Sequence, residues 1–184
     1  MARSDHPVRL VAFFSHPIQY YGPLFRRLAA RPEVDLTVVF CSDAGVRETV
    51  DRGFGVTFKW DIPLLQGYRH RFLRRPLLEI PEVLERGGFD AVWVSGCTDS
   101  WAWRLFLASW RRHVPVLLFG DSHLLNAKPW YKRSIKRLVY GWLFPRLAAA
   151  LYVGRANRAF FEHYGVRPER LFFVPHCVDN DFFR

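Results

Sequence analysis

The sequence predicts an α/β fold, a three-layer sandwich in which helices cover both faces of a mostly parallel sheet. Three observations support this prediction. Short apolar runs alternate along the chain with segments of helical periodicity. The runs are apolar throughout instead of alternating with polar residues, which is typical of strands buried on both faces. Strands that alternate with helices form βαβ units, which place the strands in parallel.

The expected strands are the short apolar runs themselves. They cover residues 8–14, 34–40, 91–94, 114–119, 149–153 and 171–174, with a less regular strand at 56–60. No internal repeat and no low-complexity linker separates them. The 184 residues leave room for one ordinary domain or one lobe of a two-lobed protein.

The expected helices begin and end at residues suited to those positions. The first opens at Gly22-Pro23 and runs to about residue 31, because proline fits the first turn of a helix. The second covers residues 78–86 and stops at Gly87-Gly88, because glycine adopts the left-handed conformation that ends helices. Helical periodicity predicts three more helices, over residues 100–112, 130–147 and 157–164.

Composition argues against several classes of protein. Half the residues are apolar, so a sizeable core can form and disorder is not expected. The cysteines form no CxxC pair and no Cys/His cluster, which argues against a zinc site and against a secreted disulfide framework. The N-terminus lacks a signal-peptide core, and the longest apolar stretch, residues 138–153, is interrupted by Pro145-Arg146. We therefore expect a cytoplasmic protein, soluble or peripheral on the inner face of the cytoplasmic membrane.

The net charge of +10 favours an anionic partner. Nucleic acid, an acidic membrane and a phosphorylated substrate all meet this description. An acidic partner lobe would balance the charge equally well. Because the sequence contains no recognised nucleic-acid motif, nucleic acid is not expected as the partner.

Ligands of open parallel sheets bind beyond the carboxyl ends of the strands, so the candidate site lies in the loops that follow them. The first loop, residues 15–22, lacks GxGxxG, and the chain has no P-loop motif, which argues against both kinds of nucleotide site. It does carry polar donors and a glycine before a helix N-terminus, where backbone amides favour anions. The alternative is a tight turn with a surface histidine. The candidate residues of this loop are Ser15, His16, Gln19, Tyr20 and Gly22.

The loops after the strands at 91–94 and 114–119 add carboxylates. Ser95 and Asp99 are candidates in the first of them, although capping of the next helix would explain Asp99 without a ligand. Asp121 and His123 stand two residues apart in the other, where they can act as a base and its orienting partner. The alternative is that one side chain caps a turn and the histidine is merely exposed.

Two further segments concentrate arginine. Arg155 lies near the start of a helix, where it opposes the helix dipole unless an anion compensates; pairing of Arg155 or Arg158 with Glu162 is the alternative. A dense basic loop at residues 69–75 is expected to bind the phosphate of a substrate or a membrane. Its candidate residues are Arg69, Arg71 and Arg74.

Residues 130–147 predict a basic amphipathic helix. Its apolar positions share one side, namely Tyr131, Ile135, Leu138, Val139 and Trp142. Its cations lie opposite, namely Lys132, Arg133, Lys136 and Arg137. Such a helix either packs its apolar stripe on the sheet with a solvated basic face, or lies on an anionic bilayer. Both hold if a packed helix presents its cations to lipid head groups.

Three segments resemble the N-terminal domain of GT-B glycosyltransferases of the family 4 type. Residues 11–30 (VAFFSHPIQYYGPLFRRLAA) are similar to the first strand, nucleotide-facing loop and helix of a subgroup that reads HPIQY. Residues 114–121 (VPVLLFGD) are similar to a VPxxxTxH strand and loop, with Asp121 in place of the histidine. Residues 164–183 match the hinge pattern GVxxxKIxVxPNGVDxxxF, with His176-Cys177 in place of Asn-Gly, and this match is the most specific.

The resemblance implies a Rossmann-like, acceptor-side lobe over residues 1–174, the start of a hinge at 175–184, and a donor-binding domain outside these residues. The first loop would face the donor phosphates, and Asp121 and His123 would act in catalysis. The acceptor-binding residues would be Ser95, Asp99, Arg69, Arg71, Arg74 and Arg155, and the hinge residues Pro175, His176 and Asp179. Members of this family require no metal cofactor, because protein cations and a helix dipole balance the departing diphosphate.

The function so implied is transfer of a hexose from a nucleotide-sugar donor to an anionic or lipid-linked glycan acceptor, as in the synthesis of cell-envelope polysaccharide. We expect residues 1–184 to be inactive without the donor-binding domain. One alternative is a catalytically inactive module that binds anionic lipid or glycan. Another is a lobe of a sugar-nucleotide epimerase, which has the same architecture.

Overall fold

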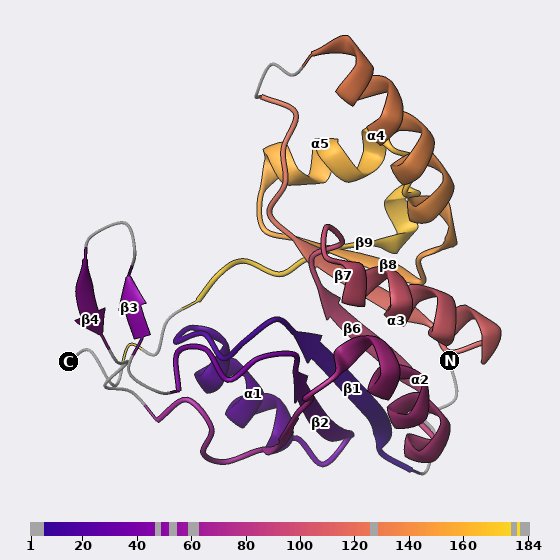
Figure 1. Cartoon of the computed structure of the whole chain (residues 1–184). Helices are drawn as coiled ribbons and strands as arrows, with labels where there is room; N and C mark the ends of the chain where they lie inside the picture. The colour runs from indigo at the N-terminus through magenta and orange to yellow at the C-terminus, as the bar shows by residue number, and fades with distance from the viewer. Residues whose placement is uncertain are drawn as a thin grey trace.

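A computed structural model describes residues 6–46, 49–51, 55–58, 63–125, 129–177 and 180 of the chain. Its main feature is a seven-stranded sheet with the order β5-β2-β1-β6-β7-β8-β9, in which every neighbouring pair is parallel (Figure 1). Helices pack on both faces of this sheet. The predicted three-layer α/β sandwich is therefore confirmed.

The strands of the main sheet, with the exception of β5, follow the predicted apolar runs closely. They are β1 (Val8–Phe14), β2 (Val34–Phe40), β5 (Arg69–Phe72), β6 (Ala91–Ser95), β7 (Val116–Gly120), β8 (Ala149–Tyr152) and β9 (Leu171–Phe173). A separate antiparallel pair is formed by β3 (Thr49–Asp51) and β4 (Val56–Phe58). The strand predicted at 56–60 is thus present as β4, outside the main sheet, and residues 59 and 60 lie outside the described part of the chain.

The outer strand β5 occupies the segment for which the sequence predicted a basic loop. That prediction was wrong because an edge strand pairs along one side only and tolerates charged side chains that reach water. Arg69, His70 and Arg71 are exposed on β5. Phe72 anchors the strand by stacking on Phe40, with 5.4 Å between ring centroids.

The direction of each crossover decides which face a helix covers. The chain moves from β1 to β2 in one direction and from β6 through β9 in the other, and right-handed crossovers place the connecting helices on opposite faces. One face is covered by α1 (Tyr21–Ala29). The other face is covered by α2 (Pro76–Gly87), α3 (Ser100–Arg111), α4 (Trp130–Leu143) and α5 (Arg155–His163).

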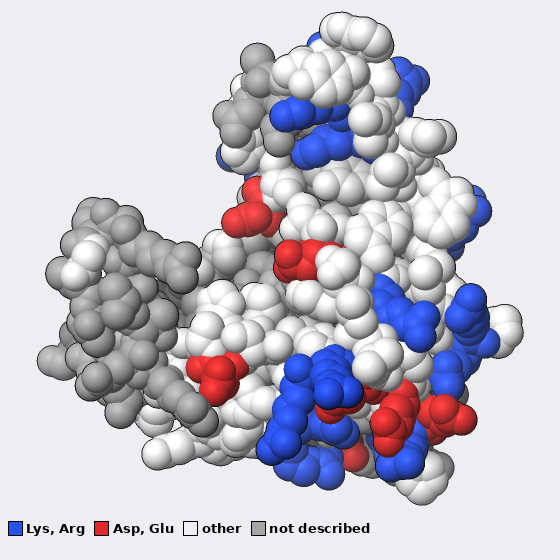
Figure 2. Space-filling model, viewed as in Figure 1, with Lys and Arg blue, Asp and Glu red and all other residues white. Residues whose placement is uncertain are grey.

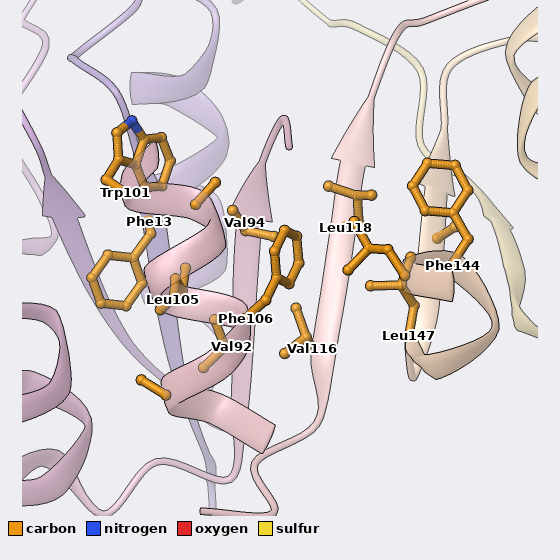
Figure 3. Close-up of a cluster of buried hydrophobic side chains, with 14 of the residues drawn as sticks. Phe13, Val92, Val94, Trp101, Leu105, Phe106, Val116, Leu118, Phe144 and Leu147 are labelled. Atoms are coloured by element: carbon orange, nitrogen blue, oxygen red, sulfur yellow. The ribbon is translucent and has the colours of Figure 1, made fainter. Parts of the chain in front are cut away.

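The larger of the two cores lies between the sheet and the four helices α2 to α5, with α3 at its centre (Figure 3). Successive strand residues point to opposite faces, so Phe13 faces α3 while Phe14 faces α1. Leu105 and Phe106 of α3 are fully buried against the sheet. Burial of each such side chain contributes about 1.5–3 kcal/mol. This packing fixes the strands, and with them the starting points of the loops that form the site.

Helix α4 ends at Leu143, earlier than the predicted end at residue 147, and a short 3₁₀ turn (Phe144–Arg146) follows. Pro145 explains the difference, because it has no backbone N–H to continue the α-helical hydrogen bonds. No helix among the described residues is both long enough and apolar enough to cross a bilayer.

Candidate functional site

The four loops predicted to form the site lie along one edge of the sheet. β1, β6, β7 and β8 are parallel neighbours, and their residues are in register near the carboxyl ends (Figure 1). Phe13 pairs with Val94, Val94 with Leu118, and Leu118 with Ala150. The loops after these strands therefore leave the sheet side by side, as the sequence predicted.

An open cleft of about 390 Å³ occupies one part of this edge. It is lined by Ser15, Cys41, Ser42, Pro76, Leu77, Asp99, Ser100 and Trp101, which come from the ends of β1 and β2, from the start of α2, and from the start of α3. Three hydroxyl groups and one carboxylate thus face apolar walls. This volume is in the range of small-molecule sites, and the mixture of polar groups and an aromatic wall is typical of them. Of the predicted candidates, Ser15 and Asp99 lie here.

The Asp99 carboxylate is not used to cap α3. Asp99 occupies the N-cap position, but its side chain makes no capping hydrogen bond, and only its carbonyl oxygen accepts from Ala102, at 3.1 Å. The capping role considered for Asp99 is therefore absent, and the carboxylate is left to the cleft. Beside it, burial raises the pKa of the Cys41 thiol to about 12, and the charge of Asp99 adds to the effect. Cys41 is consequently a neutral thiol at physiological pH.

The first loop places a neutral imidazole next to this cleft. The Ser15 hydroxyl and His16 Nδ1 are 2.9 Å apart. Burial lowers the pKa of His16 below its usual value. A neutral histidine donates from one ring nitrogen and accepts at the other. The Ser15–His16 pair is therefore suited to hydrogen bonding with an uncharged polar ligand.

Tyr21, the first residue of α1, is a site residue that the sequence reasoning missed. Its ring packs on Phe14 and Phe119, at 4.6 and 5.8 Å between centroids, and its side chain is buried. Its hydroxyl interacts with the Ser95 side chain, and Asp121 is close enough to influence it electrostatically. Burial raises the pKa of Tyr21 well above its usual value, so the phenol stays protonated and donates. The sequence could have indicated Tyr21 as a site residue, because long side chains at a helix start point back over the preceding turn.

The loop after β7 carries the predicted catalytic pair, Asp121 and His123, both exposed. No hydrogen bond joins the two side chains in the described part of the chain; instead, His123 Nδ1 accepts from the backbone N–H of Leu125, at 3.3 Å. The predicted base-and-partner geometry is thus not present in this structure. Whether either residue acts in catalysis stays a prediction.

Asn157, a buried residue of α5, fixes this loop through hydrogen bonds. The sequence reasoning did not single out this residue. Its amide nitrogen donates to the Ser122 carbonyl oxygen at 2.7 Å, and its amide oxygen accepts from the Val153 N–H at 3.1 Å. Asn157 is only 3% exposed. One side chain therefore connects the Asp121–His123 loop to the end of β8.

The predicted hinge segment runs back across the same edge after β9. The Val174 N–H donates to the Tyr152 carbonyl oxygen at 2.8 Å. The His176 ring then packs between Tyr20 and Phe119, with 5.5 Å to each ring centroid. Pro175 lines the same small depression as Tyr20, whereas Asp179 lies outside the described residues. The end of the described chain thus lies against the first loop.

A model of the protein family described as Glycosyltransferase Family 4 matches residues 24–182. The chain belongs to glycosyltransferase family 4. A search of curated proteins gave no significant match.

Solved structures similar to this family 4 chain are GT-B enzymes. The UDP-N-acetylglucosamine 2-epimerase from Rickettsia bellii matches with a TM-score of 0.61 and 12% identity, over 93% of this chain and 45% of that one. Anabaena Alr3699/HepE in complex with UDP and glucose matches with 0.63 and 12%, over 96% and 46%. Acinetobacter baumannii MurG matches with 0.52 and 9%, over 97% and 48%. At these identities the matches show the fold alone, a Rossmann-like GT-B lobe, and the chain spans under half the length of these proteins.

The predicted acceptor arginines of the family 4 chain are distributed over several places. Arg69 forms an ion pair with Asp35. Arg71 lies 3.9 Å from the Glu79 carboxylate and lines a separate cavity of about 250 Å³ that shares no lining residue with the cleft. Arg74 is two residues before Pro76, which lines the cleft. Of these three, Arg74 is the nearest in sequence to a residue that lines the cleft.

The remaining predicted arginine, Arg155, lies shortly after the end of β8. It is the first residue of α5 and is exposed. The ion pair considered for this helix is present between Arg158 and Glu162, at 2.9 Å. Arg155 therefore stays available at the edge, next to the loop that Asn157 holds.

Gln19 and Gly22 are the remaining predicted residues of the first loop. Gln19 is half-buried. Gly22 is buried in the first turn of α1, where an added Cβ would lie 3.2 Å from the Leu64 carbonyl oxygen, so a close packing contact explains the glycine. Within the described ranges no group of three His, Cys, Asp or Glu residues is placed to hold a metal ion.

One of the two sequence-based interpretations of α4, in which its apolar stripe packs on the sheet, is wrong. It contacts the core through Tyr140 and Leu143, with Val139 half-buried. The rest of the stripe is exposed. Lys136 lies on the packed side, over the Tyr140 ring at 5.5 Å from its centroid, and is half-buried. The stripe is therefore not a sheet-packing surface, and Lys136 does not share the exposed face of the other three cations.

Proposed function

We propose that this family 4 chain is the acceptor-binding lobe of an enzyme that transfers a sugar from a nucleotide-sugar donor to a hydroxyl group of a glycan. The observation that supports it best is the cleft beside Asp99. Hydroxyl and carboxylate groups hydrogen-bond sugar hydroxyls, and an aromatic wall such as Trp101 suits the apolar face of a sugar ring. A second lobe would supply the donor site across this edge.

The chemistry that this edge can perform follows from its neighbours. A base takes the proton from the acceptor hydroxyl as it attacks the donor sugar. Asp121 and His123 are the candidates, because their loop is adjacent to the loop that carries Asp99. Neutral His16 and the amides at the start of α1 are the donors proposed to face the departing phosphate, where charge stabilisation is commonly the largest catalytic contribution.

The glycan portion that enters the cleft is expected to be uncharged. None of the described residues that line the cleft is a lysine or arginine, and Asp99 contributes a negative charge. An anionic or lipid-linked acceptor would therefore place its charged part outside the cleft, towards Arg74 or Arg155. The transfer of a hexose and a role in envelope polysaccharide remain part of this proposal.

The test uses the full-length enzyme and separates binding from chemistry. Asp99→Asn should raise the KM for the acceptor about tenfold, since a hydrogen bond to a charged group contributes about 1.5–3 kcal/mol, and should leave donor affinity unchanged. Asp121→Ala and His123→Ala should lower kcat instead. Glu85→Gln, an exposed change on α2 outside the cleft, is the matched control.

Two results would contradict the proposal. One is unchanged acceptor KM in Asp99→Asn together with unchanged kcat in both loop variants. The other is measurable sugar transfer by residues 1–184 alone, because a lobe without a donor site has nothing to transfer.

A further inference from the structure

The outward face of α4 carries large apolar side chains that are exposed. Tyr131, Ile135, Leu138 and Trp142 follow the i, i+4, i+7, i+11 spacing of a single helix face. Ile135 is 60% exposed and Leu138 is 77% exposed. Single exposed apolar residues need no explanation, but a contiguous stripe marks an interaction surface.

Aromatic residues border this stripe at both ends of the helix. Trp130 is 78% exposed at the first residue of α4. Trp142, in the last turn, contacts Trp110 of α3 at 5.3 Å between ring centroids and carries the Arg146 guanidinium over its face at 4.6 Å. Tryptophan prefers the boundary between water and hydrocarbon, because its ring is apolar and its N–H is polar.

The charges around the stripe have one sign. The sequence contains no aspartate or glutamate between residues 122 and 161. Lys132, Arg133 and Arg137 are exposed on the other sides of α4. Figure 2 shows basic side chains gathered with uncharged ones over the part of the molecule where Figure 1 places α4. A helix with an exposed apolar face and exposed cations on its other sides complements an anionic lipid bilayer.

A second copy of the chain fits this face less well. Two such faces in contact would bring like charges together, in a chain whose net charge is already +10. We propose that α4 lies in the plane of an anionic bilayer surface, with its apolar stripe in the acyl boundary and its cations among the lipid head groups. This inference does not depend on sugar transfer.

The position of α4 links this docking to the site. The helix follows the Asp121 loop, and Leu125 between them is 79% exposed. Docking of α4 would therefore hold the carboxyl edge of the sheet near the lipid surface. A substrate anchored in that surface would reach the loop without leaving the bilayer.

The test is co-sedimentation of the chain with vesicles made of equal parts phosphatidylglycerol and phosphatidylcholine, compared with vesicles of phosphatidylcholine alone. Binding to the anionic vesicles is expected. Ile135→Ser with Leu138→Ser should lower the partition coefficient at least tenfold, because about 0.8 kcal/mol is lost per buried CH₂. Lys132→Ala with Arg137→Ala should lower it roughly thirtyfold, at about 1 kcal/mol per cation.

Matched controls lie elsewhere on the surface. Leu78→Ser changes an exposed leucine of α2 (66% exposed), and Arg27→Ala changes an exposed arginine of α1. Neither should alter vesicle binding. Equal binding by the apolar pair variant and the parent chain would refute docking, since attraction of the net charge alone would then explain it. Equal binding to both vesicle types would also refute it, as would a dimer in solution that Leu138→Ser dissolves.

Discussion

Asn157 offers the sharpest test of how the candidate site is held together. We predict that Asn157→Ala destabilises the chain by about 2–4 kcal/mol. The change removes two hydrogen bonds, to the Ser122 carbonyl oxygen at 2.7 Å and from the Val153 N–H at 3.1 Å. A neutral hydrogen bond contributes about 1 kcal/mol net, and a buried backbone group left without a partner costs about 1–3 kcal/mol. Because Asn157 is almost fully buried, water does not readily replace it.

The assay is equilibrium unfolding in urea, with the midpoint as the readout and an unchanged m value as the sign that only stability has changed. Arg158→Ala is the control on the same helix. It removes an exposed ion pair with Glu162, and exposed ion pairs contribute little to stability. Amide hydrogen exchange in residues 120–125 should also become faster in Asn157→Ala. A loss of stability no larger than that of Arg158→Ala would refute the reasoning.

A companion variant, Asn157→Asp, adds a dependence on pH. Only the protonated acid can donate to the Ser122 carbonyl oxygen, so the folded state favours that form and raises the pKa of the new side chain above about 3.9, its usual value. The hydrogen bond is then fully present below that value and is lost as the pH rises through the higher, folded-state pKa. Asn157→Asp should therefore lose stability relative to the parent chain as the pH rises from acidic to neutral. A difference that stays constant with pH would contradict the donor role.

Two other predictions use the same chain. Gly88→Ala should destabilise the chain by about 1 kcal/mol in urea unfolding, because Gly88 ends α2 with φ of 56° and a Cβ would lie 2.8 Å from the Arg9 guanidinium. Gly141→Ala is the control: Gly141 lies in α4 with open space at its Cβ, so this change should stabilise the chain by up to about 1 kcal/mol. Equal effects of the two changes would contradict the conformational argument. Alkylation with iodoacetamide at mildly alkaline pH should label exposed Cys177 well before Cys41, whose pKa is raised to about 12 by burial; equal rates by mass spectrometry would refute the protected thiol.

The fold was largely predictable because buried strands leave a plain signal. β1 and β2 have the bounds that their apolar runs predicted, and every loop assigned to the carboxyl edge lies there. β5 was missed because periodicity reports burial, and a strand at the sheet edge can be polar. The exposed stripe of α4 was ambiguous for the opposite reason: periodicity shows that a helix has an apolar face, but not what that face contacts.

The sequence predicted which loops form the candidate site, but not which side chains contact one another there. Ser15 and Asp99 follow strands directly, so their place in the chain already puts them at the edge. Tyr21 and Asn157 act through burial and through partners distant in sequence, as in the contact between Asn157 and Ser122, 35 residues apart. The sequence also grouped Arg69 with Arg74, although the turn into α2 separates the cleft from the outer strand.

The distribution of charge indicates that α4 and the cleft have separate functions in the family 4 lobe. A net charge of +10 by itself suggests a cationic binding site, but the cleft is lined by hydroxyls and a carboxylate. The exposed cations of α4 instead share a helix with an exposed apolar stripe, and this helix follows the Asp121 loop. Electrostatic attraction then acts on the surface to which the protein is recruited, and hydrogen bonding acts on the sugar. The two functions should separate in experiments. Raised salt should weaken vesicle binding, because salt screens the attraction between exposed opposite charges. It should leave the Asp99 contribution to acceptor KM unchanged, because the proposed partner of Asp99 is an uncharged sugar hydroxyl.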